Sequence, residues 1–238
     1  NLKKDLFDIY IKKSFTQKKT VSKSIKIKKI SLSNVFFKYE SIKNKRRTEV
    51  FKNLYEILKE EQPDYIVHCG DLAHTKTQLS PEYFELATDF LKNLADIAET
   101  HIILGNHDGN LRNSSRQDAI TPIVEALNHP SLILHKYSGE VQLEDDLTLN
   151  VLSIFDETNW EDPSDPEAIN IALYHGAINN SQTDLGWVMD HGDHDIKVFD
   201  KFDYAMLGDI HRTQYLDKAQ RVWYAGSTVQ QNFGERDR

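Results

Sequence analysis

Four polar clusters along the chain carry the residue types that bind metal ions and move protons. They are Gly70-Asp71-Leu72-Ala73-His74, Gly105-Asn106-His107-Asp108, Tyr174-His175-Gly176 and Gly208-Asp209-Ile210-His211. This mixture of carboxylate, amide and imidazole groups suits Mn, Fe or Zn better than the all-oxygen cages typical of Mg or Ca. A glycine in each cluster allows the backbone to turn sharply and to approach an ion.

Residues 105–108 place three functional groups on one turn. The amide oxygen of Asn106 can bind a metal, the imidazole of His107 can contact a phosphoryl oxygen, and the carboxylate of Asp108 can orient that imidazole. Any one of these clusters alone could be an ordinary turn. Because four of them each follow a short apolar run, the sequence predicts one shared metal site.

Short apolar strands that alternate with amphipathic helices must position these clusters. Ser80 is expected to cap a helix whose first residue is Pro81. The first half of the chain predicts an α/β core, whereas the second half has strands with few long helices between them. The expected strands are Ile25–Val35, Tyr65–Val67, Ile102–Leu104, Val141–Leu143, Leu147–Ile154, Ile169–Tyr174, Tyr204–Leu207 and Val222–Ala225, and the expected helices are Arg46–Glu60, Tyr83–Ala98 and Asp118–Leu127.

Composition narrows the class of protein. With 238 residues and 39% apolar content, the chain can bury a sizeable core. No apolar run reaches the roughly 18 residues of a membrane span, and no apolar signal-peptide core is present near the start. Cys69 is the single cysteine, so an internal disulfide cannot form, and a reducing cytoplasm is the expected location.

The net charge of -8 hides an asymmetry along the chain. Residues 1–48 contain 15 Lys and Arg against 3 Asp and Glu, whereas the remainder contains 14 against 34. We expect residues 1–24 to be a loosely ordered basic leader, which is either solvated or in contact with phosphates. Residues 25–238 are then one catalytic core, cut short at its C-terminal end.

The order GDxxH, GNHD, HG and G(H/D)xH resembles that of calcineurin-like metallophosphoesterases. This resemblance implies a four-layer α-β-β-α sandwich with two divalent cations, Mn above all, at the carboxyl ends of the strands. Residues 70–74 and 226–235 are also similar to the nuclease core of SbcD-type DNA repair subunits. A phage-encoded subunit of this type is one option for the chain. That narrower resemblance implies that the substrate is DNA and that the partner is an SbcC-like SMC-type ATPase. It also implies a homodimer as one assembly state, and no association with a membrane.

The resemblance also implies a role for each matching residue. Asp71 bridges the two metals, and His211 reaches the first of them. The second metal is completed by Asn106, His175 and Asp209, the last of which stands where many relatives have histidine. The remaining roles are catalytic: His107 stabilises the transition state or protonates the leaving oxygen, Asp108 orients it, and His74 touches the phosphate near the scissile bond.

The first metal motif departs from the family pattern. The family has Asp-x-His at the end of the first strand, whereas this chain has Asn34-Val35-Phe36. Asn34 can offer only a neutral carbonyl oxygen, and Phe36 cannot bind a metal. We therefore expect one strong metal site and one weak or empty site, with slowed or absent hydrolysis.

Two further polar segments leave alternatives open. Arg116 could hold a substrate phosphate, or residues 113–118 could simply cap the helix that follows. Residues 191–195 could line the rim of the active site, although a surface turn that caps a short helix is the simpler interpretation. At the level of the whole chain, an SbcD-like nuclease competes with a stand-alone phosphatase or nucleotide phosphodiesterase, and with a non-catalytic scaffold for an SMC-type ATPase.

Overall fold

The computed structural model describes residues 29–32, 41–77 and 79–228. The predicted leader over residues 1–24 and the first metal motif at Asn34 and Phe36 lie outside the described residues. No helix among those that the structure describes is long and apolar enough to cross a membrane.

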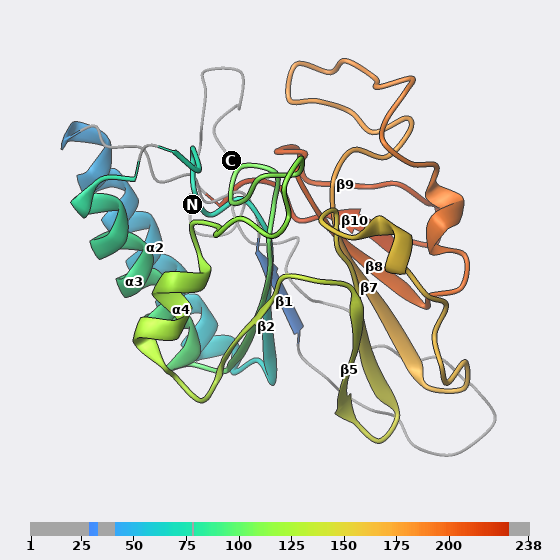
Figure 1. Ribbon diagram of the computed structural model, residues 1–238, viewed down its shortest axis with the longest axis horizontal. Helices are drawn as coiled ribbons and strands as arrows, with labels where there is room; N and C mark the ends of the chain where they lie inside the picture. The colour runs from blue at the N-terminus through green and yellow to red at the C-terminus, as the bar shows by residue number, and fades with distance from the viewer. Residues whose placement is uncertain (1–28, 33–40, 78, 229–238) are drawn as a thin grey trace.

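The first sheet is entirely parallel, with the order β1-β2-β3-β4. Its strands are β1 (Lys29–Leu32), β2 (Tyr65–Cys69), β3 (Glu99–Ile103) and β4 (Leu132–His135). The connections between them contain α2 (Ser41–Glu61), α3 (Pro81–Ala95) and α4 (Thr121–Leu127), which lie together against one face of this sheet (Figure 1). Parallel strands need such crossover connections, since a short hairpin can join only antiparallel strands.

The second sheet has the order β5-β6-β7-β8-β10-β9. Its four central strands run parallel, whereas β5 and β9 at the two edges are antiparallel to their neighbours. The strands are β5 (Gly139–Glu144), β6 (Leu147–Leu152), β7 (Ile169–His175), β8 (Tyr204–Gly208), β9 (Gln214–Tyr215) and β10 (Val222–Tyr224). Two short 3-10 helices, η1 (Glu157–Asn159) and η2 (Ile196–Phe199), lie in its connections.

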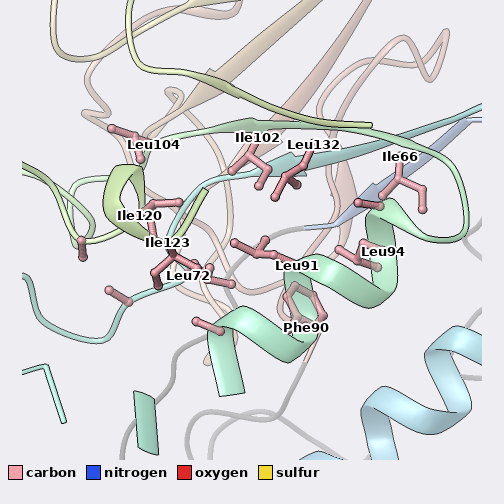
Figure 2. Close-up of a cluster of buried hydrophobic side chains, with 14 of the residues drawn as sticks. Ile66, Leu72, Phe90, Leu91, Leu94, Ile102, Leu104, Ile120, Ile123 and Leu132 are labelled. Carbon is pink, nitrogen blue, oxygen red and sulfur yellow. The ribbon is translucent and has the colours of Figure 1, made fainter. Parts of the chain in front are cut away.

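Three apolar layers hold the molecule together. Below the helices, Ile66, Ile102 and Leu132 from the first sheet pack against Phe90 and Leu91 of α3 (Figure 2). A second layer separates the two sheets and contains Val67, Cys69, Ile103, Leu149, Ile171 and Met206. Because neighbouring residues of a strand point to opposite faces, β2 and β3 contribute to both layers.

The third apolar layer covers the outer face of the second sheet. Phe199 and Phe202 pack there in one cluster with Tyr174 of β7 and Leu207 of β8. The α/β fold class is confirmed. The predicted outer layer of α-helices is not found in the described part of the chain. Residues 176–203, which include the 3-10 helix η2, cover this face instead.

Most predicted elements appear with small shifts at their ends. The Ser80 hydroxyl accepts a hydrogen bond from the backbone N–H of Tyr83 at 3.3 Å, and Pro81 is the first residue of α3, as predicted. The predicted strand over Ile102–Leu104 is β3, which ends one residue earlier, at Ile103. The sequence pattern missed β4 and the two-residue β9.

A pair of histidines at the first sheet should make the folding stability depend on pH. His101 Nδ1 lies 2.9 Å from His135 Nε2, and His101 Nε2 lies 3.0 Å from Glu99 Oε1. Burial lowers the pKa of each imidazole to about 4, and for His135 the neighbouring His101 adds to this effect. Both rings are therefore neutral in the folded protein at pH 7.

Acidification should remove stability in a defined pH window. An unfolded histidine binds a proton below pH ~6.5, whereas these two do so only near pH 4. Their contribution is complete above pH ~6.5 and falls as the pH drops toward 4, by about 3 kcal/mol for His101. The free energies of unfolding of the wild type and of a His101→Gln/His135→Gln variant, measured in urea, should converge as the pH falls across this window. His191→Gln, an exposed control, should leave the pH dependence unchanged.

Candidate metal centre

The predicted ligands are brought together by the ends of β2, β3, β7 and β8. These strands belong to different sheets, and the interface between the sheets places their carboxyl ends side by side. Asp71 follows β2 with φ 61°, and Asp209 follows β8 with φ 92°. Residues other than glycine seldom adopt this left-handed region, and such backbone strain concentrates at functional sites.

Asp71, His175 and Asp209 form a group that can hold a metal ion. Each offers a ligand atom, and these atoms all lie within 4.8 Å of one another. His175 Nε2 lies 3.2 Å from Asp71 Oδ2 and 3.8 Å from Asp209 Oδ1. Asp71 and His175 are buried, whereas Asp209 is partly exposed, so the group has one side open to solvent.

The orientation of His175 favours metal binding through Nε2. Its Nδ1 lies 2.7 Å from the carbonyl oxygen of Cys69, which can only accept a hydrogen bond. Nδ1 therefore carries the hydrogen, and in the neutral ring Nε2 keeps its lone pair. A Cβ atom on Gly70 would lie only 2.5 Å from His175 Nδ1, so glycine there makes room for the ring.

Asn106 adds a fourth group from the end of β3. Its Oδ1 is buried and has no hydrogen-bond partner among the described residues. A buried polar atom without a partner is costly unless something absent from the chain itself satisfies it. His175 Nε2 makes no well-aligned hydrogen bond there either, and its contact is the ion pair with Asp71. Asn106 and His175 are both predicted ligands of the second metal.

Asp108 does not orient His107, so this part of the prediction is wrong. Its carboxylate accepts hydrogen bonds from the backbone N–H groups of Asp71, Ala73 and Gly105 at 2.8 to 2.9 Å. The side chain thus turns inward and ties the loop after β2 to the loop after β3. Burial and the nearby Asp71 carboxylate raise the pKa of Asp108 to about 7, and the N–H donors act in the opposite direction.

A backbone carbonyl takes the orienting role instead. His107 Nδ1 lies 2.8 Å from the carbonyl oxygen of His74, and the rings of His74 and His107 stack with 6.2 Å between their centroids. The backbone N–H of His107 also donates to Asp71 Oδ1 at 3.0 Å. The catalytic candidate is therefore anchored at both its ring and its backbone to the loop that carries Asp71.

The comparisons with known proteins agree with this geometry. The family model for "Calcineurin-like phosphoesterase" matches residues 44–213, which include all four clusters up to His211. The chain belongs to the calcineurin-like phosphoesterase family. Members of this family are hydrolases of ester bonds that use divalent metals.

Two viral proteins are similar to the chain. It is 38% identical over 201 residues to "Uncharacterized protein R555" of Acanthamoeba polyphaga mimivirus, a match that covers 79% of this chain but 15% of the mimivirus protein. It is 26% identical over 192 residues to "Putative phosphoesterase 244L" of Invertebrate iridescent virus 6, with 73% of this chain and 61% of that protein covered. The chain therefore spans less than two thirds of either viral protein.

Among solved structures, one similar chain is a 5′-nucleotidase candidate from Staphylococcus aureus in complex with alpha-ketoglutarate. The match has a TM-score of 0.45 and 16% sequence identity, and covers 84% of this chain and 48% of that one.

The calcineurin-like phosphoesterase site is electrostatically prepared for a cation. Burial alone would lower the pKa of His175, but the carboxylates of Asp71 and Asp209 raise it to about 10. In turn, His175 holds the pKa of Asp71 below its usual value in spite of burial, while burial raises the pKa of Asp209. The carboxylates of buried Asp71 and partly exposed Asp209, the imidazole of His175 and the amide oxygen of Asn106 fit a divalent metal of the Mn, Fe or Zn type, which would take the place of the proton on His175 Nε2.

His211 lies beside this group but is not part of it. Its Nδ1 is 4.0 Å from Asp184 Oδ2, on the loop that follows β7. Its positive charge would lower the pKa of Asp209, which places the two side chains near one another. Binding of His211 to a first metal, together with Asn34, stays a prediction.

The two remaining polar segments are explained by local structure. Arg116 is exposed, and no contact places its guanidinium at the metal centre. Asp118, two residues on, accepts hydrogen bonds from the N–H groups of Ile120 and Thr121 at the start of α4, as the capping alternative predicts. In the same way Asp195 caps η2 by accepting from Lys197 N at 3.0 Å.

Two backbone groups that orient the site have no signal in the residue types. The carbonyl oxygens of Cys69 and His74 fix the imidazoles of His175 and His107. Every residue has a carbonyl, so residue types cannot reveal which ones act. From the spacing of the clusters one could infer only that Cys69, the residue before Gly70, lies near the end of β7.

Proposed function

We propose that this chain is a metal-dependent phosphodiester hydrolase that acts on DNA, as the nuclease subunit of an SbcD-type assembly. The observation that supports it most is the convergence of Asp71, His175 and Asp209 within 4.8 Å, beside the unpartnered Oδ1 of Asn106. Mn²⁺ is the proposed metal. An SbcC-like SMC-type ATPase is the proposed partner, and a homodimer is the proposed assembly.

The residues of the site have distinct tasks in this reaction. When bound, a divalent metal would lower the pKa of water and neutralise charge on the phosphoryl oxygens. Asp71, Asn106, His175 and Asp209 hold and orient that metal. The hydrogen on His107 Nδ1 is directed at the His74 carbonyl, so a proton passed to the leaving oxygen would come from Nε2 of the protonated ring.

Replacing His107 should separate chemistry from metal binding. We expect His107→Gln to lower kcat by roughly 10²- to 10⁴-fold, the usual contribution of a general acid. Mn²⁺ affinity should change little, because the contact of residue 107 with Asp71 uses the backbone N–H, which the variant keeps. Calorimetric Mn²⁺ titration beside steady-state kinetics measures both, and a parallel fall in affinity would contradict the assignment.

Substrate choice tests the proposal against its enzyme alternative. The chain is assayed with Mn²⁺ on linear duplex DNA, on bis(4-nitrophenyl) phosphate and on 4-nitrophenyl phosphate. Cleavage of DNA, lost in EDTA, is the expected result. Hydrolysis confined to the monoester would favour a stand-alone phosphatase, and hydrolysis of the small diester without DNA cleavage would favour a nucleotide phosphodiesterase.

The scaffold alternative rests on the departure at Asn34 and Phe36. If one metal site is weak, millimolar Mn²⁺ should restore activity, and calorimetry should find one tight site and one weak site. The double variant Asn34→Asp/Phe36→His restores the family motif and should raise activity at low Mn²⁺. Two tight sites of equal affinity in the unmodified chain would exclude the asymmetry, and DNA cleavage by that chain would exclude the scaffold.

A further inference from the structure

A cavity of about 300 Å³ lies between the segment after β7 and the segment that follows His211, and none of the proposed metal ligands lines it. One wall is formed by residues 179–182 after β7, and the other by residues 212–216, which follow His211 and include β9. This volume is at the lower end of the ~300–1,000 Å³ range of small-molecule pockets.

The walls of this cavity are fixed to each other by one side chain. The Gln214 amide oxygen accepts from the backbone N–H of Gln182 at 2.9 Å, and its Nε2 donates to the carbonyl oxygen of Gln182 at 2.8 Å. The same Nε2 lies 3.2 Å from the carbonyl oxygen of Arg212. Gln214 thus pairs with Gln182 as a neighbouring strand would, so the cavity is formed before any ligand binds.

Arg212 supplies a cation to this cavity. It lines the wall, is only partly exposed, and has no ion pair or hydrogen bond through its guanidinium within residues 41–77 and 79–228. By contrast, Arg221 in the same part of the fold is paired with Asp217 at 3.3 Å. An unpaired, partly buried guanidinium in a chain with net charge -8 is suited to a phosphate group.

Tyr215 supplies an aromatic face at the rim. The residue lines the cavity and is 44% exposed, and its ring lies 6.5 Å, centroid to centroid, from that of Trp223. A nucleobase can stack on such a ring whatever its identity. Arg212 and Tyr215, which lie one and four residues beyond the predicted metal ligand His211, match the phosphate and the base of a nucleotide.

We propose that this cavity is a nucleotide subsite, in which Arg212 binds a phosphate next to the scissile one and Tyr215 stacks on the attached base. The inference rests on the proposed function, since it assigns a place to the substrate of the same metal centre. It predicts that the enzyme prefers diesters that extend at least one nucleotide beyond the bond that is cut.

The first experiment measures binding without catalysis. Thymidine 5′-monophosphate and inorganic phosphate are titrated in EDTA, with amide resonances followed by NMR. We expect shifts at residues 179–182 and 212–216, and an affinity about tenfold lower in Arg212→Gln for both ligands. Tyr215→Ala should weaken binding of the nucleotide by about fivefold or more but leave inorganic phosphate unaffected.

The second experiment measures specificity. With Mn²⁺, the ratio of kcat/KM for a dinucleotide to that for bis(4-nitrophenyl) phosphate should fall about tenfold in Arg212→Gln and less in Arg212→Lys. Lys218→Gln, which removes an equal charge from an exposed site outside the cavity, should leave this ratio unchanged. Thermal unfolding of each variant verifies that the fold is intact.

The two experiments separate the subsite from the proposed function. Absence of nucleotide-induced shifts at the cavity, or equal affinities in wild type and Arg212→Gln, would overturn the subsite even in an active nuclease. Binding at the cavity in a chain that hydrolyses no phosphodiester would overturn the proposed function and retain the subsite.

Discussion

Replacing Asp71 with asparagine is expected to weaken Mn²⁺ binding by roughly 100-fold or more, beyond the ~10–100-fold cost of altering a group that only supports a ligand. Asp71 Oδ1 accepts the N–H of His107 at 3.0 Å, and Oδ2 lies 3.2 Å from His175 Nε2. Asparagine keeps the shape but removes the charge that the site presents to a cation. Hydrolysis should fall at least as far as metal affinity, because the same group would position the reacting centre.

Calorimetric titration with Mn²⁺ measures this effect, together with the rate on bis(4-nitrophenyl) phosphate. Asp162→Asn is the matched control, since that carboxylate is exposed in the loop before β7. The control should retain the wild-type affinity. If Asp71→Asn bound Mn²⁺ as tightly as the wild type, the three-residue group would not be the metal site.

Replacing Asp108 with alanine should cause the largest loss of stability among the changes considered. The substitution leaves the buried N–H groups of Asp71, Ala73 and Gly105 without their acceptor. Each unsatisfied buried donor costs about 1–3 kcal/mol, so the free energy of unfolding should fall by about 3 kcal/mol or more. Metal affinity should fall too, because the loops after β2 and β3 lose the group that joins them.

Urea unfolding at pH 7.5 measures this loss. Asp108→Asn keeps one oxygen acceptor and should lose less stability than Asp108→Ala, whereas Asp162→Ala should stay within about 0.5 kcal/mol of the wild type. If Asp108→Ala were as stable as the wild type but inactive, the carboxylate would serve the reaction and the original assignment to His107 would return.

The misassignment of Asp108 shows where sequence reasoning ends. A carboxylate next to His107 in the chain suggested a pair, but adjacent residues on a turn can point in opposite directions. The loop after β2, more than 30 residues away in sequence, presents two N–H donors to Asp108, and the same loop presents the His74 carbonyl to His107. Such contacts depend on how two loops meet, which residue types do not encode.

Local features, in contrast, can be predicted from the sequence. Ser80 and Pro81 predict the start of α3 because capping depends on neighbours in the chain. The apolar runs before Asp71, Asn106, His175 and Asp209 predict strands, and parallel strands bring their carboxyl ends to one edge. The left-handed backbone at Asp71 and Asp209 was not predicted, since glycine was expected to make these turns.

The sequence by itself determined the strand–helix alternation, the four clusters and the family to which they belong. Only the tertiary structure decided that two sheets meet so that Asp71, His175 and Asp209 converge, that carbonyls of residues 69 and 74 orient the imidazoles, and that Gln214 joins the two walls of a cavity. The physical reason is range: capping and strand formation depend on residues close in sequence, whereas ligand convergence depends on packing between segments about 30 to 140 residues apart.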